Sequence, residues 1–357
     1  MISTMPLSVR EGRPWLAFIG PLLIGISLIF PAAAFAQDPG SPVVQEYSVQ
    51  PGSGPHDAVP DATGFVWYTG QRDGTLGRLD PRTGEYTLIA LGPGSAPHGV
   101  VIGPDGAPWV TDGGQNAILR VDPASFDVLV FPLPGRNANL NTPAFDLRGV
   151  LWFTGQNGVI GRLDPSVGVV EVWNAPRGPG AYGISTAPDG TVYFASLASS
   201  YLGRIDGDDG SMVALDPPTP RQGTRRVWPD SAGRLWISEF NAGQLGRYDP
   251  VTGEWAEWRL PGDRPQAYAV YVDERDQVWL SDTRADTIVR FDPNTETFTT
   301  VPISSPSNVA QLGGVNSWVM KALAAPFAYS DPSDTTQPVE IWGAERGRDA
   351  VFVVRYQ

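Results

Sequence analysis

The chain has 357 residues, a formal net charge of −13 and no cysteine. Nucleic acids and anionic lipid surfaces bind clustered Lys and Arg, so the charge argues against both as partners, and the absence of Cys excludes disulfides, thiolate catalysis and Cys-based zinc sites. The 41 Gly and 35 Pro, beside 10% aromatic residues, indicate many short strands joined by tight turns.

The first 36 residues have the pattern of a secretory signal peptide. Two arginines, Arg10 and Arg13, precede an apolar run over residues 15–30, and small residues at positions 34 and 36 frame a cleavage site after Ala36. Prolines at positions 21 and 31 favour cleavage over a retained membrane anchor. We therefore expect an exported protein, periplasmic or extracellular, whose mature part is residues 37–357 and has no membrane attachment.

A short strand that carries an Arg recurs through the rest of the chain. Successive copies lie 42, 42, 42, 43, 43 and 65 residues apart, and in all but the last an Asp follows the Arg two positions later: Arg78, Arg120, Arg162, Arg204, Arg247, Arg290 and Arg355. We expect the Arg and the Asp to form a structural pair, because they share one face of the strand. Seven copies of about 42 residues, each a supersecondary unit, predict a repeat protein.

Each copy contains four segments with period-two alternation, which indicates strands. The second carries an aromatic residue that we expect to pack between units: Trp67, Trp109, Trp152, Tyr193, Trp236, Trp279 and Trp342. The pattern predicts an all-β, seven-bladed β-propeller of four-stranded blades.

The ends of the repeat predict how the ring closes. Residues 43–49 form a fourth-strand sequence with no blade before it, and residues 350–356 form a third strand with no fourth after it. Pairing of the two would close the ring by joining the N-terminal strand to the C-terminal blade. The last blade also has an insertion at about residues 313–338, in which residues 315–323 could form a strand.

The starts of the first strands should meet at one mouth of the central channel, where propellers bind ligands. Counting back eleven residues from each aromatic gives a polar ring: His56, His98, Asn141, Tyr182, Arg225 and Tyr268, with Asn308 as the seventh member. Counting forward three residues gives acids on the same face at Asp112, Glu239, Asp282 and Glu345. Two imidazoles near carboxylates can bind a divalent cation or perform acid–base chemistry.

Residues 96–100 (APHGV), 151–154 (LWFT) and 160–163 (IGRL) resemble the repeat of the virginiamycin B lyase (streptogramin B lyase) family, and the resemblance extends over essentially all of residues 37–357. It implies a seven-bladed propeller that opens a cyclic ester by β-elimination with Mg²⁺, and antibiotic resistance as a physiological role. By position, His98 matches the family's catalytic His, His56 its substrate-contacting His, and Asp112 its metal-binding Glu.

The remaining positions receive their expected roles from their place at the mouth. Asn141, Tyr182, Arg225 and Tyr268 would bind a small-molecule substrate, a cyclic ester or lactone, and Glu239, Asp282 and Glu345 are further candidates for the metal.

The chain departs from the family pattern at two points. Ala96 stands where the family has a metal-binding Glu, and the histidines lie in the first two blades instead of the last two. Two alternatives therefore stay open: a non-catalytic exported propeller that binds a ligand at the same mouth, and a gluconolactonase-like lactone hydrolase with a carboxylate and Asn metal site. Nothing in the sequence requires an oligomer, so a monomer is expected.

Overall fold

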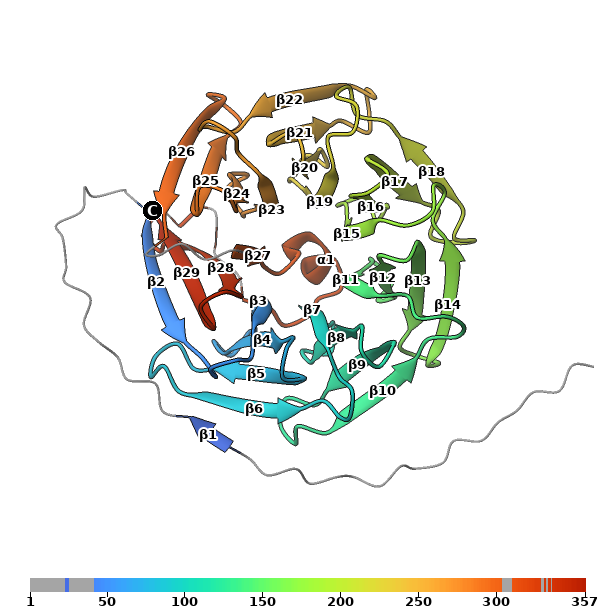
Figure 1. Cartoon of the computed structure of the whole chain (residues 1–357), viewed down its shortest axis with the longest axis vertical. Coiled ribbons are helices and arrows are strands. Elements are labelled where there is room, and N and C mark those ends of the chain that lie inside the picture. Colours follow the sequence, from blue (N-terminus) through green and yellow to red (C-terminus); the bar gives the residue numbers. More distant parts are fainter. Residues whose placement is uncertain (1–22, 26–41, 304–309, 329–330, 332, 335) are drawn as a thin grey trace, which may run out of the picture.

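Seven antiparallel sheets, the blades, surround a central axis in the computed structural model, as Figure 1 shows. Six of them have four strands, and in blade 1 a short strand, β1 (Leu23–Gly25), adds a fifth. The structure describes residues 23–25, 42–303, 310–328, 331, 333–334 and 336–357. The predicted all-β, seven-bladed propeller is confirmed. Among the described residues, no helix has the length and apolarity of a membrane span.

Each blade is a meander whose first strand lines the axis and whose fourth lies at the rim (Figure 1). Blade 1 consists of β3 (Pro55–Pro60), β4 (Val66–Gly70), β5 (Thr75–Leu79) and β6 (Tyr86–Ala90). Blade 2 consists of β7 (Pro97–Ile102), β8 (Pro108–Asp112), β9 (Ala117–Val121) and β10 (Val128–Pro132). Blade 3 consists of β11 (Leu140–Phe145), β12 (Leu151–Gly155), β13 (Val159–Asp164) and β14 (Val169–Asn174).

The next three blades follow the same order. Blade 4 consists of β15 (Ala181–Thr186), β16 (Val192–Ser196), β17 (Tyr201–Ile205) and β18 (Met212–Leu215). Blade 5 consists of β19 (Thr224–Pro229), β20 (Leu235–Glu239), β21 (Gln244–Tyr248) and β22 (Trp255–Arg259). Blade 6 consists of β23 (Ala267–Val272), β24 (Val278–Asp282), β25 (Thr287–Asp292) and β26 (Thr297–Pro302).

Blade 7 is assembled from both ends of the described chain. It consists of β27 (Ala310–Gly313), β28 (Val339–Glu345), β29 (Ala350–Tyr356) and β2 (Val43–Ser48). Strand β2 pairs antiparallel with β29, from Val43 opposite Arg355 to Ser48 opposite Ala350. Blade 7 thereby receives its outer strand from a segment that precedes blade 1 in the sequence. A three-residue strand, β1 (Leu23–Gly25), pairs with β6; the rest of the expected signal peptide lies outside the described residues.

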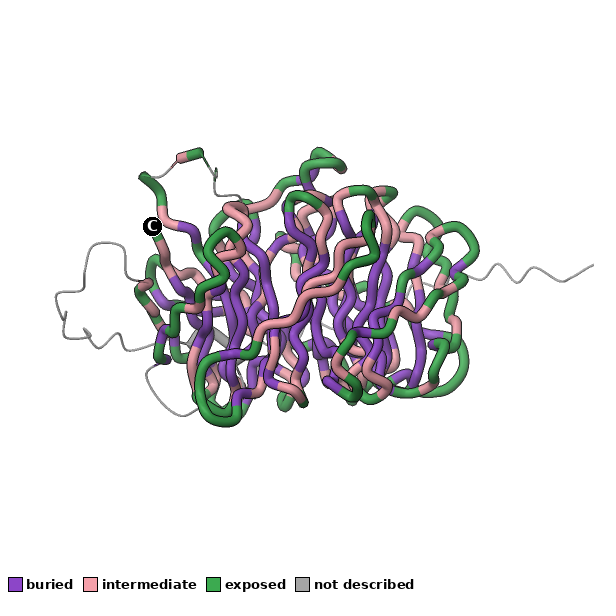
Figure 2. The backbone as a smooth tube through the Cα atoms, turned by 90° about the horizontal axis from the view of Figure 1, so that it is seen from above, coloured by how far each residue is buried: buried purple, intermediate pink, exposed green. Residues whose placement is uncertain are grey.

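The core lies between the blades, and buried residues run through the depth of the disc while exposed ones lie at its loops (Figure 2). The second-strand Trp residues are buried as predicted, and Trp67, Trp152, Trp236 and Trp279 expose 0% of their surface. An Asp six residues earlier accepts a hydrogen bond from the indole nitrogen, as Asp61 does from Trp67 Nε1 at 2.8 Å. The recurring Trp is therefore a packing residue.

The predicted pairing of the recurring Arg with the following Asp is mostly wrong. Of the ion pairs that the structure describes, only Arg120–Asp122, at 3.9 Å, is of that kind. Arg78 instead donates to the carbonyl oxygen of Pro123 in the next blade, while Asp80 accepts the backbone N–H of Arg82 inside its own turn. The reason is that a turn's free N–H groups lie closer to a short carboxylate than the guanidinium does.

The insertion of blade 7 turns inward to the axis, where Figure 1 shows its helix α1 (Ser317–Ala322). The possible strand at residues 315–323 is a helix in the structure. Val315, Val319 and Leu323 recur every four residues, which suits one face of a helix, and the side chain of Asn316 caps its N-terminus. Asn316 also donates to the carbonyl oxygen of Thr186 at 2.8 Å, which ties the helix to the far end of β15.

Candidate functional site

A bulge near the start of the first strand aims the predicted ring residues at the axis. In blades 1 to 6 the first residue of the first strand pairs with the last residue of the second strand. The pairing register then shifts, as it does between Pro55 and Ala58 in blade 1. A bulge adds an unpaired residue and re-aims side chains. His56 and Asp57 both lie in this bulge in blade 1, and the equivalent positions in blade 2 are His98 and Gly99.

The ring predicted from the sequence is present in six blades and is closely packed. Its members His56, His98, Asn141 and Arg225 are buried, while Tyr182 and Tyr268 are half-buried. In blade 7 the equivalent position is Gln311, because Ala310 pairs with Glu345. Asn308, the expected seventh member, lies outside the described residues.

Hydroxyl groups on the second strands hold neighbouring bulges together. Thr69 Oγ1 accepts the backbone N–H of Asp57 at 3.1 Å and donates to the carbonyl oxygen of His98 at 2.9 Å. Thr111 makes the same two kinds of contact between blades 2 and 3. Each hydroxyl therefore fixes a ring position of its own blade against that of the next.

The two histidines are in contact. The centroids of the His56 and His98 rings lie 3.8 Å apart, with 44° between the ring planes. His56 Nδ1 lies 2.8 Å from Asp57 Oδ1, and Asn141 Nδ2 lies 3.1 Å from His98 Nε2. Blades 1, 2 and 3 thus contribute to a single cluster, as the sequence predicts for His56 and His98.

Arg226 fixes the tautomer of His98 through a chain of hydrogen bonds. The guanidinium has only donors, so Thr142 Oγ1 accepts from Arg226 Nη1 at 2.7 Å. The Thr142 hydroxyl must then donate to Asn141 Oδ1, at 2.8 Å, which turns the Asn141 NH₂ group toward His98. His98 Nε2 therefore carries the lone pair and its Nδ1 carries the proton. This Nδ1 is buried without a partner among the described residues.

The tautomer of His56, the other ring of the contact, is also fixed by a hydrogen bond. Because Asp57 accepts from Nδ1, the lone pair of His56 is on Nε2. Burial lowers the pKa of His56 against the opposing effect of Asp57, and burial together with His56 lowers the pKa of His98 strongly. Burial disfavours ionisation of Asp57, but Arg226 and His56 outweigh it and lower its pKa. At neutral pH the cluster thus holds two neutral imidazoles and one carboxylate.

The aromatic members of the ring hold a second guanidinium. Arg225 lies 3.1 Å from the Tyr268 ring centroid and 4.3 Å from that of Tyr182, and it donates to the Tyr182 hydroxyl at 3.0 Å. Its other contact is with the carbonyl oxygen of Tyr268, at 2.6 Å. No carboxylate among the described residues pairs with Arg225, so its positive charge is held by ring faces and dipoles.

Two of the four predicted metal ligands hold loops. Asp112 is fully buried and accepts hydrogen bonds from the backbone N–H groups of Ala96, Gly114 and Gln115, and from the Ser95 hydroxyl. Asp282 accepts backbone N–H groups in the same way, from Gln266, Arg284 and Ala285. Hydrogen-bond donors surround both carboxylates, and neither belongs to the histidine cluster.

The other two predicted ligands, Glu239 and Glu345, are buried, and their carboxyl oxygens lack hydrogen-bond partners within the described chain. Burial raises the pKa of Glu239 to about 8, and burial with the nearby Glu46 raises that of Glu345 to about 7. The structure groups neither with the histidines.

The donor atoms that the structure does bring together do not suit Mg²⁺. Among the described residues, the group able to hold a metal is His56, Asp57 and His98, with ligand atoms within 4.8 Å of one another. Mg²⁺ prefers an octahedron of oxygens, whereas this group offers two imidazoles and one carboxylate. Arg226 also lies 3.5 Å from Asp57 Oδ1, where its charge opposes a second cation.

Three residues of the cluster were not predicted from the sequence: Asp57, Thr142 and Arg226. Each directly follows a predicted ring residue. In a regular strand a neighbour points to the opposite face, so the pattern assigns it no place at the axis. The signal that could have found them is the repeated bulge, which no single blade sequence reveals.

Comparison with known proteins decides the family. A sequence profile of the Virginiamycin B lyase family matches residues 37–222 and 148–311. The chain belongs to the virginiamycin B lyase family. No curated protein matches it significantly.

Solved structures share the fold of this virginiamycin B lyase family member. A streptogramin B lyase is 19% identical with a TM-score of 0.75, and the match covers 88% of this chain and 98% of that one. Virginiamycin B lyase from Staphylococcus aureus is 19% identical with a TM-score of 0.76, over 89% and 100% of the two chains. A catalytically inactive variant of the S. aureus enzyme, solved with Quinupristin, has a TM-score of 0.75 at 19% identity, over 89% and 100%.

Proposed function

We propose that the protein is an exported carbon–oxygen lyase that opens an ester or lactone of a small molecule by β-elimination. Family membership supports the reaction class, and one observation carries the proposal. Two neutral imidazoles are in contact, one with its lone pair on Nε2 and the other with its proton on Nδ1. A base and a hydrogen-bond donor are thus side by side, as the elimination of a C–H proton and a C–O group requires.

The roles follow from the hydrogen bonds of each ring. His56 Nε2 takes the proton from the carbon α to a carbonyl, and Asp57 orients the ring and stabilises the imidazolium. The C–H electron pair forms the C=C bond, the β C–O bond breaks, and the oxygen leaves as a carboxylate. His98 Nδ1–H donates to this leaving oxygen. The resemblance matches His56 to a substrate-contacting His; in this proposal His56 is the base, because Asp57 contacts it, and His98 keeps a catalytic role.

Charge develops on the carbonyl oxygen during proton removal. Arg225 and Arg226 lie beside the histidines, and their guanidinium groups stabilise negative charge in a site with little water. Tyr182 and Tyr268 hold Arg225, and Asn141 holds His98, so we propose that these ring residues position the reacting groups. Because the donor set does not fit Mg²⁺, no step of the proposed reaction uses a metal.

The test is an assay of residues 37–357 with a type B streptogramin and with simpler esters that carry the ester oxygen β to a carbonyl. Elimination leaves the mass of a ring-opened product equal to that of the cyclic substrate, whereas hydrolysis adds one water. We expect H56A and H98A to lower kcat by about 10²-fold or more while the circular dichroism spectrum is unchanged. T300V, on the exposed outer strand β26, is the matched control.

A second candidate is a non-catalytic exported propeller that binds a ligand at this mouth. It is favoured by the low exposure of His56 and His98, 2% and 6%, and by the engagement of Asp112 with loop N–H groups. This candidate replaces the lyase proposal if the protein turns over none of the substrates and if H98A binds one of them with the affinity of the wild type. A lactone hydrolase with a carboxylate and Asn metal site is less favoured, because the group of acidic and histidine ligands that the described residues bring together has a single carboxylate, Asp57.

We propose export by a signal peptide of residues 1–36, and a monomer as the working form. N-terminal sequencing of the protein from a secreting host, with Gln37 expected first, tests the export. Light scattering of the purified protein tests the monomer.

A further inference from the structure

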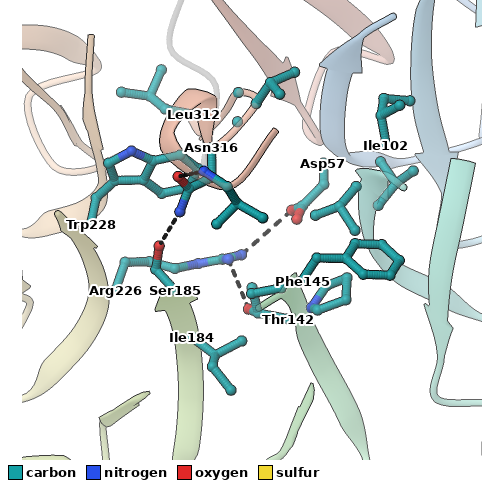
Figure 3. Close-up of a pocket in the computed structure, with 18 of the residues that line it drawn as sticks. Asp57, Ile102, Thr142, Phe145, Ile184, Ser185, Arg226, Trp228, Leu312 and Asn316 are labelled. Atoms are coloured by element: carbon teal, nitrogen blue, oxygen red, sulfur yellow. Dashed lines mark hydrogen bonds and ion pairs between the residues drawn. The ribbon is translucent and has the colours of Figure 1, made fainter. Parts of the chain in front are cut away.

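The central channel contains a cavity of about 60 Å³, lined on one side by residues of helix α1. Figure 3 shows most of its lining residues. One water needs roughly 10–15 Å³ in comparable terms, so the cavity has room for a small molecule. Its lining comes from the first strands of all seven blades and from the insertion. It lies further along these strands than the histidines, whose rings are not among its lining residues.

The cavity has one charged end and a wide apolar wall, and the neutral polar residues Ser185, Gln311 and Asn316 also line it. Arg226, Asp57 and Thr142 lie together at the charged end in Figure 3. The wall is made by aliphatic and aromatic side chains from separate elements: Val100, Ile102, Phe145, Ile184, Trp228 and Val319. This arrangement suits a molecule with a charged head and a short apolar tail.

The positive charge at the charged end is only partly satisfied. Arg226 is buried, its single carboxylate partner Asp57 lies 3.5 Å away, and its Nε–H has no acceptor among the described residues. Asp57 is also shared with His56. Arg225, directly before Arg226, has no carboxylate partner within the described chain. The described cluster thus has two guanidinium groups and one carboxylate, and of the two only Arg226 lines the cavity. A buried charge without a partner is costly.

We propose that this cavity binds a small monocarboxylate with a short aliphatic tail, its head on Arg226 and its tail against the apolar wall. The cavity lies beside the proposed lyase site and shares Asp57, Thr142 and Arg226 with it, while the histidines belong to the lyase site alone. Binding can be measured without any turnover, so the two proposals fail independently.

The experiment is calorimetric titration of residues 37–357 with butyrate in chloride-free buffer near neutral pH. We expect saturable binding with one site per chain. Acetate should bind more weakly by about fourfold for each missing methylene, because the wall buries the tail. Butyramide, which has the same shape without the charge, should bind about tenfold or more weakly.

Variants locate the ligand. R226K keeps the charge but loses the planar fork, and A144L fills the cavity from β11; both should lose most of the butyrate affinity. R204Q, at an exposed Arg on β17, is the matched control, and H98A should keep wild-type affinity because it alters only the mouth. The proposal is overturned if wild-type protein does not bind butyrate, if butyramide binds equally well, or if folded R226K and A144L both keep wild-type affinity.

Discussion

At the scale of single residues, the same position in different blades has different chemistry. The end of the second strand holds Asp112 in blade 2, Glu239 in blade 5 and Glu345 in blade 7. The aspartate is short enough to accept the loop N–H groups beside it, as its hydrogen bonds show. The glutamates are one methylene longer, and the carboxyl of Glu239 lies against Gly246, where a Cβ would come within 2.6 Å of its Oε1. Neither glutamate carboxyl has a hydrogen-bond partner among the described residues, and Glu345 has an ion pair with Arg348 at 3.8 Å.

Because of these two glutamates, we expect the free energy of unfolding to fall as the pH rises. Their pKa values in the folded protein, about 8 and about 7, lie above the ordinary 4.5, so the native state binds more protons than the unfolded state. Their contribution is complete below pH 4.5 and is lost as the pH rises through 7 and 8. The slope should approach about 1.4 kcal/mol per pH unit for each group. Urea unfolding from pH 5 to 8 measures it.

In E239Q the pH dependence should be smaller, since the amide does not ionise. E254Q, at an exposed glutamate, is the matched control and should follow the wild type. An unchanged slope in the E239Q/E345Q double variant would contradict the assignment.

Divalent cations provide a second prediction at this scale. A ligand that binds only the native state raises Tm. Because Arg226 neighbours the one described group able to hold a metal, excess Mg²⁺ or EDTA should leave Tm unchanged. A rise of several degrees with Mg²⁺ would show that the carboxylates rearrange to bind it.

At the scale of elements, the ring residues depend on contacts between blades. Thr69 joins the bulge of blade 1 to the carbonyl oxygen of His98 in blade 2, and Ser238 joins blades 5 and 6 in the same way. Blade 4 has Ala195 at this position and lacks the hydroxyl. The geometry of the histidine pair therefore depends on a residue that touches neither imidazole.

Replacement of Thr69 by Val tests this dependence. The variant leaves the Asp57 N–H and the His98 carbonyl oxygen buried without this partner, so we expect a loss of about 1–3 kcal/mol in the free energy of unfolding. The same change at exposed Thr300 should cost less than about 0.5 kcal/mol. Urea denaturation compares the two. An equal effect at both positions would mean that the hydroxyl does not hold the blades together.

At the scale of the whole molecule, β2 joins the two ends of the ring. Its Tyr47 is buried against Trp342, with ring centroids 6.0 Å apart, and Val49 is buried beside it. The N–H of Val49 donates to the carbonyl oxygen of Asp349 at 2.8 Å. Without β2, strand β29 would be an open edge.

A chain that begins at residue 51 should therefore unfold at a much lower urea concentration than one that begins at residue 42. We expect a loss of at least about 3 kcal/mol, the cost of removing a large buried aromatic residue. Y47A in the longer chain should account for a substantial part of it. Equal midpoints for the two chains would show that the ring is stable without this strand.

The sequence by itself determined the architecture and six members of the polar ring, whereas the position in blade 7, Gln311, came from the strand pairing. The Arg strand recurs at a regular spacing, as at Arg78, Arg120 and Arg162, and the number of its copies gives the number of blades. The spacing is regular because repeats that bury the same faces have the same length. Period-two alternation shows which residues lie on each strand face. His56 and His98 could be brought together on this basis, since equivalent positions of adjacent blades meet at the axis.

Only the tertiary structure decided which groups share a cavity. Asp57 and Arg226 lie on blades 1 and 5, and their approach depends on two bulges and on the diameter of the ring. The helix at residues 317–322 is decided by the space inside the channel, where Val319 and Met320 are buried against blades that are distant in sequence. Such contacts are set by the closure of all seven blades, so no local pattern contains them.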